Sequence, residues 1–120
     1  MKYMLLIHNN MSVYAGWSEE ERQALFAEVG VIMTELKESG ELIRDMALAD
    51  PSLTKTVRVR DGVTSTTDGP FAEAKEQFGG FLLVDCDTPE RAIEIAARWP
   101  DAKYFAMEVR PVMHDSAADL

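Results

Sequence analysis

Residues 2–8 read KYMLLIH, and this short run decides the fold. An apolar run of this length with an aromatic residue and an isoleucine indicates a β-strand. Its side chains alternate between two faces, with Tyr3, Leu5 and Ile7 on one and Met4, Leu6 and His8 on the other. Both faces are mainly apolar, so we expect the strand to be covered on both sides, which a single layer of helices cannot do.

A helix follows within SEEERQALFAEVGVIMTELKESG, residues 18–40. Ser18 and Glu21 have the spacing of a capping box, and Gly40 is a typical helix stop. Apolar side chains recur at helical spacing at Leu25, Val29, Ile32 and Leu36, and Phe26 and Met33 widen the stripe. The pattern predicts an amphipathic helix that ends at Gly40.

The rest of the chain supplies the other elements of an α+β fold. They are a strand over 41–48, a hairpin of strands 54–60 and 63–67 joined by Asp61-Gly62, a strand over 81–85, a second helix, and a strand over 103–112. The second helix is capped by Thr88 and ends at Pro100, and its buried face carries Ala92, Ile95, Ala96 and Trp99. This order predicts a ferredoxin-like βαββαβ fold with an added hairpin, in which two helices lie on one face of an antiparallel sheet. The 120 residues fit a single domain over 1–113, followed by a tail over 114–120.

The second face of this sheet also needs cover, because its strands are apolar on both sides. Pairing with a second subunit, sheet against sheet, is the economical solution. We therefore expect a homodimer of the dimeric α+β barrel type.

Charge and cysteine content narrow the possible partners. The formal net charge is −9, from 12 basic and 21 acidic residues, and such a surface repels nucleic-acid phosphates and anionic membranes. Cys86 is the single cysteine, which excludes an internal disulfide and suits reducing cytosol. The apolar run from Met4 to Ile7 is too short for a signal peptide or a membrane span. We expect a cytoplasmic protein that contacts neither nucleic acid nor membrane directly.

The sequence carries no cofactor or metal signature. His8, His114 and Cys86 have no metal-ligand spacing, so we predict no metal site. There is also no phosphate-binding loop and no nucleophile motif. Any activity is therefore expected to be cofactor-free.

The stretch TTDGPFAEAKEQFGG, residues 66–80, is the candidate functional segment. Two roles fit Asp68: an Asx-turn residue that shapes the backbone, or a carboxylate that the rigid Gly-Pro turn holds in a cleft. Residues 71–78 can form a short helix or an irregular lid, in which Glu73 and Lys75 either contact a small ligand or form a solvated face.

His8 and Asp68 are the candidate catalytic residues. A neutral imidazole at the end of the first strand can move a proton near physiological pH, with Asp68 as base or as the group that orients the ring. The alternative is a histidine that simply packs at a strand end. Arg58 and Arg60 share one face of the hairpin, where they can bind a carboxylate ligand or line a half-exposed sheet edge. Arg58, Glu73 and Lys75 are therefore the candidate ligand-binding residues.

These motifs in combination resemble the YCII-related family, in particular its DGPF-containing branch. The resemblance runs from residue 1 to about 112 and rests on Asp68-Gly69-Pro70-Phe71, Glu73, Lys75-Glu76 and Glu108-Val109-Arg110-Pro111. It implies a dimeric ferredoxin-like fold, and some relatives occur beside, or fused to, extracytoplasmic-function sigma factors. A second branch, which includes a dehydrochlorinase, is thought to use a His–Asp pair with the histidine in the first helix. That region here, around Val29 and Gly30, has no histidine, so the pair is not carried over.

Two functions therefore fit the sequence. The first is a cofactor-free small-molecule-binding or acid–base enzyme module, acting on a polar organic substrate by isomerase-like or lyase-like proton transfer. The second is a non-enzymatic regulatory or interaction domain with a transcription-related protein partner, for which the acidic surface would suit a basic partner.

Overall fold

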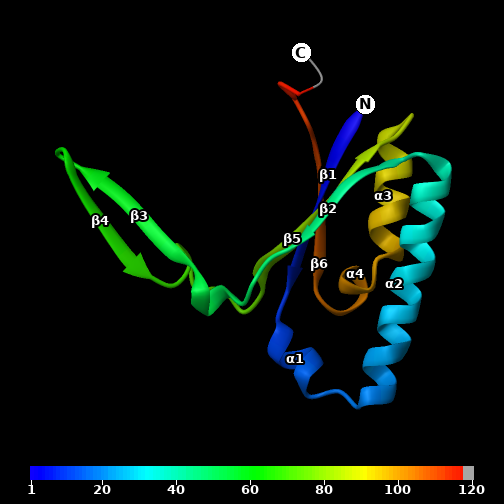
Figure 1. The fold of residues 1–120 in the computed structure, drawn as a ribbon, viewed down its shortest axis with the longest axis horizontal. Coiled ribbons are helices and arrows are strands. Elements are labelled where there is room, and N and C mark those ends of the chain that lie inside the picture. Colours follow the sequence, from blue (N-terminus) through cyan, green and yellow to red (C-terminus); the bar gives the residue numbers. More distant parts are fainter. Residues whose placement is uncertain (118–120) are drawn as a thin grey trace.

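A four-stranded antiparallel sheet in the order β2-β5-β1-β6 forms the body of the protein (Figure 1). The computed structural model describes residues 1–117. The strands are β1 (Lys2–Asn9), β2 (Leu42–Ala47), β5 (Gln77–Asp85) and β6 (Ala106–Pro111). The strand β1 pairs with both β5 and β6 and is therefore a central strand of the sheet.

The helices α2 (Glu19–Ser39) and α3 (Pro89–Arg98) pack on one face of this sheet (Figure 1). Two short helices, α1 (Met11–Ala15) and α4 (Pro100–Tyr104), lie together at one end of it. The capping box of α2 forms as predicted, because Ser18 and Glu21 each accept the other's backbone N–H at 3.1 Å. This arrangement confirms the ferredoxin-like α+β fold. Within residues 1–117, no helix is long and apolar enough to cross a membrane.

The hydrophobic core lies between the sheet and the helices. Its buried side chains include Leu5 of β1, Leu82 and Val84 of β5, Ile32 and Leu36 of α2, and Ala92, Ile95 and Trp99 of the α3 region. The apolar stripe of α2 enters this core only in its second half. Phe26, which was expected to widen the stripe, is 70% exposed, so this prediction was wrong. The first half of α2 instead borders a cavity.

No helix of the described residues covers the opposite face of the sheet, which we call the open face (Figure 1). The alternate residues Met4, Leu6 and His8 of β1 are half-buried and lie beside Leu83, Phe81 and Phe78 of β5 in the strand register. Both faces of β1 are thus apolar, as its sequence indicates, and only one of them is covered by the helices.

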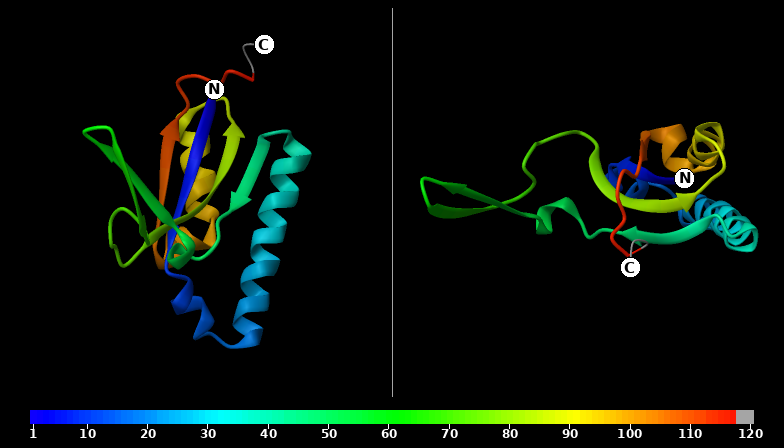
Figure 2. Two further views of the ribbon diagram at one scale, coloured as in Figure 1. Left: turned by 60° about the vertical axis from the view of Figure 1, so that its left-hand side comes forward. Right: turned by 90° about the horizontal axis from the view of Figure 1, so that it is seen from above.

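The hairpin of β3 (Lys55–Arg60) and β4 (Val63–Asp68) forms a separate two-stranded sheet that projects away from the body (Figures 1 and 2). We call it the arm. Its turn has positive φ at both Asp61 (52°) and Gly62 (75°), as the Asp-Gly pair predicts. A single 3₁₀ turn, η1 (Pro51–Leu53), precedes the arm.

Two strands begin several residues away from their predicted starts, and the segment after the arm takes the irregular one of its two predicted forms. The segment after the arm forms no helix over 71–78, because Gln77 and Phe78 already belong to β5 and pair with β1. The strand β5 therefore begins at Gln77 rather than at 81. The last strand begins at Ala106 rather than at 103, because Pro100 starts the short helix α4 instead of leading into the strand.

Candidate functional site

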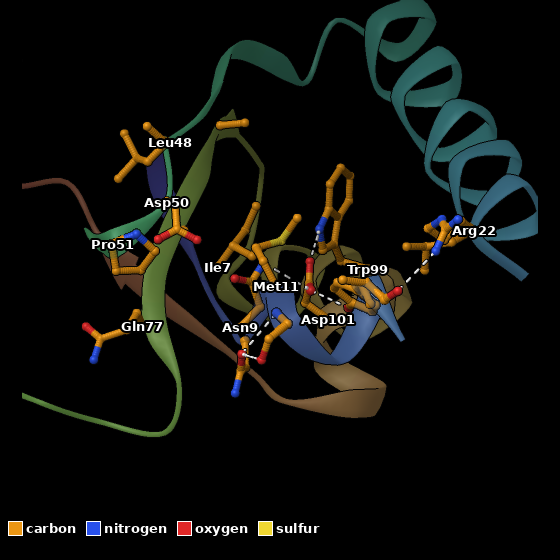
Figure 3. Close-up of a pocket in the computed structure, with 18 of the residues that line it drawn as sticks. Ile7, Asn9, Met11, Arg22, Leu48, Asp50, Pro51, Gln77, Trp99 and Asp101 are labelled. Carbon is orange, nitrogen blue, oxygen red and sulfur yellow. Dashed lines mark hydrogen bonds between the residues drawn. The ribbon is translucent and has the colours of Figure 1, made fainter. Parts of the chain in front are cut away.

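A cavity of about 690 Å³ lies where α1, the first half of α2, the end of β2 and the start of β5 meet (Figure 3). Its apolar lining comprises Ile7, Met11, Leu25, Phe26, Val29, Leu48 and Trp99. Cavities of this size and character are typical of binding sites for small organic molecules. Leu25, Phe26 and Val29 come from the first half of α2, and the other residues come from β1, α1, the end of β2 and the α3–α4 junction.

One carboxylate is buried in the wall of this cavity. Asp101 is only 8% exposed, and Tyr14 Oη donates a hydrogen bond of 2.5 Å to its Oδ1 atom. Trp99 Nε1 donates to Oδ2 at 3.0 Å, and Asn9 Nδ2 lies 3.5 Å from Oδ1. These donors satisfy a buried charge that would otherwise be costly. The carboxylate is therefore held in one position by β1, α1 and the α3–α4 junction.

Tyr14 is a fixed donor to this carboxylate. Burial raises the pKa of its phenol well above the usual value, and the hydrogen bond to Asp101 raises the pKa further. The ring of Tyr14 meets the rings of Trp17 and Phe105 edge-on, with centroid distances of 4.9 and 5.4 Å. Tyr14 thus stays protonated and keeps its orientation.

Charged groups also lie along the cavity. Arg22 donates from Nη1 to the carbonyl oxygens of Trp17 at 2.6 Å and Ala15 at 3.3 Å, so its guanidinium is tied to the loop between α1 and α2. Asp50 and the exposed Lys75 contribute to other parts of the lining. Among the residues described, 1–117, no group of three His, Cys, Asp or Glu side chains is placed to hold a metal ion.

The structure does not bring His8 and Asp68 together within the chain. His8 lies on the open face of the sheet, where its Nε2 atom faces the Glu108 carboxylate and its ring lies 6.0 Å from that of Phe78. Asp68 lies at the base of the arm, 83% exposed, and forms an ion pair with Lys55. A shared pocket for the two residues is therefore not formed in one chain, and their catalytic roles stay predictions.

The candidate ligand-binding residues are also separated. Arg58 lies on the arm, and its guanidinium is 5.1 Å from the centre of the Phe71 ring. Glu73 is exposed in the segment after the arm. Only Lys75 of the three reaches the cavity.

The buried cluster of Asp101, Tyr14, Asn9 and Trp99 was not predicted. The elements that the sequence predicts include neither of the two short helices that carry Tyr14 and Asp101. Two local signals could have indicated them: Asn10, whose side chain caps α1 by accepting the Ser12 N–H, and Pro100 at the first position of α4.

Comparison with known proteins places the chain in a family. The sequence model of the YCII-related domain matches residues 1–115. The protein belongs to the YCII-related family. An uncharacterised protein of Rhizobium meliloti (strain 1021) is 34% identical over 114 residues, covering 93% of this chain and 92% of that protein. This agrees with the resemblance found in the sequence motifs.

A solved structure is also similar to this YCII-related protein. It is a 5-chloro-2-hydroxyhydroquinone dehydrochlorinase from Burkholderia phenoliruptrix in complex with 2,5-dihydroxybenzoquinone. The two chains share 12% sequence identity over 98% of each, with a TM-score of 0.48.

Proposed function

We propose that this YCII-related protein is a cofactor-free module that binds a small organic molecule in the cavity and transfers a proton to or from it. The observation that carries the proposal is the buried Asp101 carboxylate in an otherwise largely apolar wall. Binding sites for small molecules commonly combine apolar walls with a few fixed polar groups. Carboxylates are also common general acids and bases, and Asp101 is the buried group that a bound molecule would meet.

Filling the cavity should weaken binding without unfolding the protein. The probe is N-phenyl-1-naphthylamine, a neutral aromatic amine, and its affinity is measured by isothermal titration calorimetry. Leu25→Trp places a larger ring in the cavity and should raise the Kd about tenfold or more. The control is Val31→Trp on the same helix, 56% exposed and outside the lining, which should leave the Kd unchanged. Absence of binding to the wild type, or equal losses in both variants, would contradict the proposal.

We also propose that the protein is a homodimer in which a second copy covers the open face of the sheet. The half-buried apolar side chains of β1 and β5 on that face support this arrangement, because large uncovered apolar faces mark contact sites. The arm supports it as well. A lone two-stranded hairpin is only marginally stable in water, and this one exposes Val57, Val59 and Val63.

A charge in the middle of the open face should therefore dissociate the dimer. Sedimentation equilibrium of the wild type should give twice the 13.4 kDa mass of the chain. Leu6→Lys should raise the dimer dissociation constant about a hundredfold, because it buries an unpaired charge in the interface. Ile93→Lys, on the exposed side of α3, is the matched control and should remain dimeric. A wild type that is monomeric at micromolar concentration would exclude the dimer.

A further inference from the structure

We infer that the cavity selects ligands whose buried end is a hydrogen-bond donor, a hydroxyl or an ammonium group, and disfavours ligands that end in a carboxylate. This inference rests on the proposed binding function and adds the chemical class of the ligand. It is carried by the position of Asp101 in the cavity wall and by the contacts that its two oxygen atoms make.

The two oxygen atoms of Asp101 are not equally engaged. Oδ1 accepts from Tyr14 Oη at 2.5 Å and lies 3.5 Å from Asn9 Nδ2, whereas Oδ2 accepts from Trp99 Nε1 at 3.0 Å. Each carboxylate oxygen offers about two acceptor positions. Oδ2 therefore keeps capacity for one more donor. Because an ionised carboxylate has no proton to give, the group that fills this position must itself be a donor.

The carboxylate cannot readily turn away from a ligand. Its donors come from residues fixed in three different elements: Asn9 at the end of β1, Tyr14 in α1 and Trp99 before α4. Tyr14 is itself confined by edge-on contacts with Trp17 and Phe105. A new donor therefore meets an acceptor that is already oriented, which lowers the entropic cost of binding.

Burial makes the sign of the ligand's charge matter. Interactions with a group that is 8% exposed are screened less by water and salt than those at the surface. A ligand carboxylate beside Asp101 would meet a like charge in this poorly screened position. Arg22 and Lys75 also line the cavity, but among the described residues neither forms an ion pair with Asp101, because Arg22 donates to two backbone carbonyls and Lys75 is exposed.

Three probes with one ring system and different end groups test this inference. They are 2-naphthylmethylamine, 2-naphthylmethanol and 2-naphthoate, titrated into ¹⁵N-labelled protein with the Kd read from amide chemical shifts. We expect the amine and the alcohol to bind at least about tenfold more tightly than the carboxylate. The shifts should be largest around Trp99 and Asp101, because Trp99 donates to Oδ2, the oxygen that the probe would also contact.

Two matched variants distinguish an effect of the buried Asp101 carboxylate from an effect of the overall negative charge of the protein. Asp101→Asn should bring the three Kd values to within about threefold of one another, since it removes the charge and replaces one acceptor with a donor. Asp50→Asn removes an equal charge from the same lining and should keep the discrimination, because Asp50 is exposed. If Asp101→Asn does not fold, Tyr14→Phe is the second variant. It retains the carboxylate and should still prefer the donors.

The outcomes distinguish this inference from the proposed function. If none of the three probes binds, the cavity is not a binding site and both fail. If all bind but 2-naphthoate binds as tightly as the amine, the binding function stands and the donor selectivity is wrong. The selectivity is also wrong if Asp50→Asn removes the discrimination as fully as Asp101→Asn does, or if Tyr14→Phe abolishes it.

Discussion

Replacing Gly80 by alanine should lower the free energy of unfolding by about 3 kcal/mol or more. Gly80 has φ +154°, and a Cβ atom added there would lie 2.4 Å from the carbonyl oxygen of Met46 and 3.1 Å from the Cα atom of Ala47. Both neighbours are backbone atoms of β2, so no flexible side chain can move aside. The strain falls where β5 pairs with β2 and β1 together, and relief would require the strands to separate.

The measurement is urea unfolding followed by circular dichroism, with Gly30→Ala as the matched control. Gly30 lies within α2, and an added Cβ there has no neighbour within 4 Å. The control should gain about 0.5–1 kcal/mol, because alanine has the higher helix propensity. A loss below about 1 kcal/mol for Gly80→Ala would mean that β2 and β5 can move apart at this point, against the close approach in the structure.

Local sequence patterns are sufficient to predict most of the architecture. The two apolar faces of residues 2–8, the capping box at Ser18 and the turn at Asp61-Gly62 all correspond to features of the structure. The sequence predicts the start of β5 four residues too late, at 81 instead of Gln77. Gln77 to Gly80 look like loop in isolation, but they gain strand pairing with β1, so long-range hydrogen bonds outweigh local propensity.

The candidate site was harder to predict because its residues meet only after folding. Tyr14 and Asp101 are 87 positions apart in the sequence, and no spacing rule connects them. The alternation of β1 did place His8 correctly on the face of Met4 and Leu6. Asp68 is the last residue of β4, and the arm that contains it projects away from the body (Figure 1). The direction of the arm depends on the connections at its base, which strand periodicity does not specify.

The pairing of Glu41 with Arg91 should make stability depend on pH in acid. Arg91 donates from Nε to Oε2 and from Nη2 to Oε1 of Glu41, both at 2.9 Å, and so ties the start of α3 to the turn between α2 and β2. The hydrogen bonds from Arg91 lower the pKa of Glu41 from 4.5 to about 2, and the hydroxyl of Ser39 contributes to the same shift. At neutral pH, Glu41→Gln should therefore cost about 2 kcal/mol, an amount that allows for partial screening of Arg91 by solvent.

The sign of the pH effect follows from the lowered pKa. The ionised Glu41 stabilises the folded state fully above about pH 4.5, and this contribution is lost as the pH falls toward 2. The difference in unfolding free energy between wild type and Glu41→Gln should therefore shrink across that interval. Urea titrations at pH 7, 5, 4 and 3 measure it. Glu94→Gln is the control, because Glu94 accepts from the same Arg91 at 2.6 Å but is 63% exposed and should contribute little. A difference that stays constant from pH 7 to 3 would show that Glu41 acts through its shape and hydrogen bonds rather than through its charge.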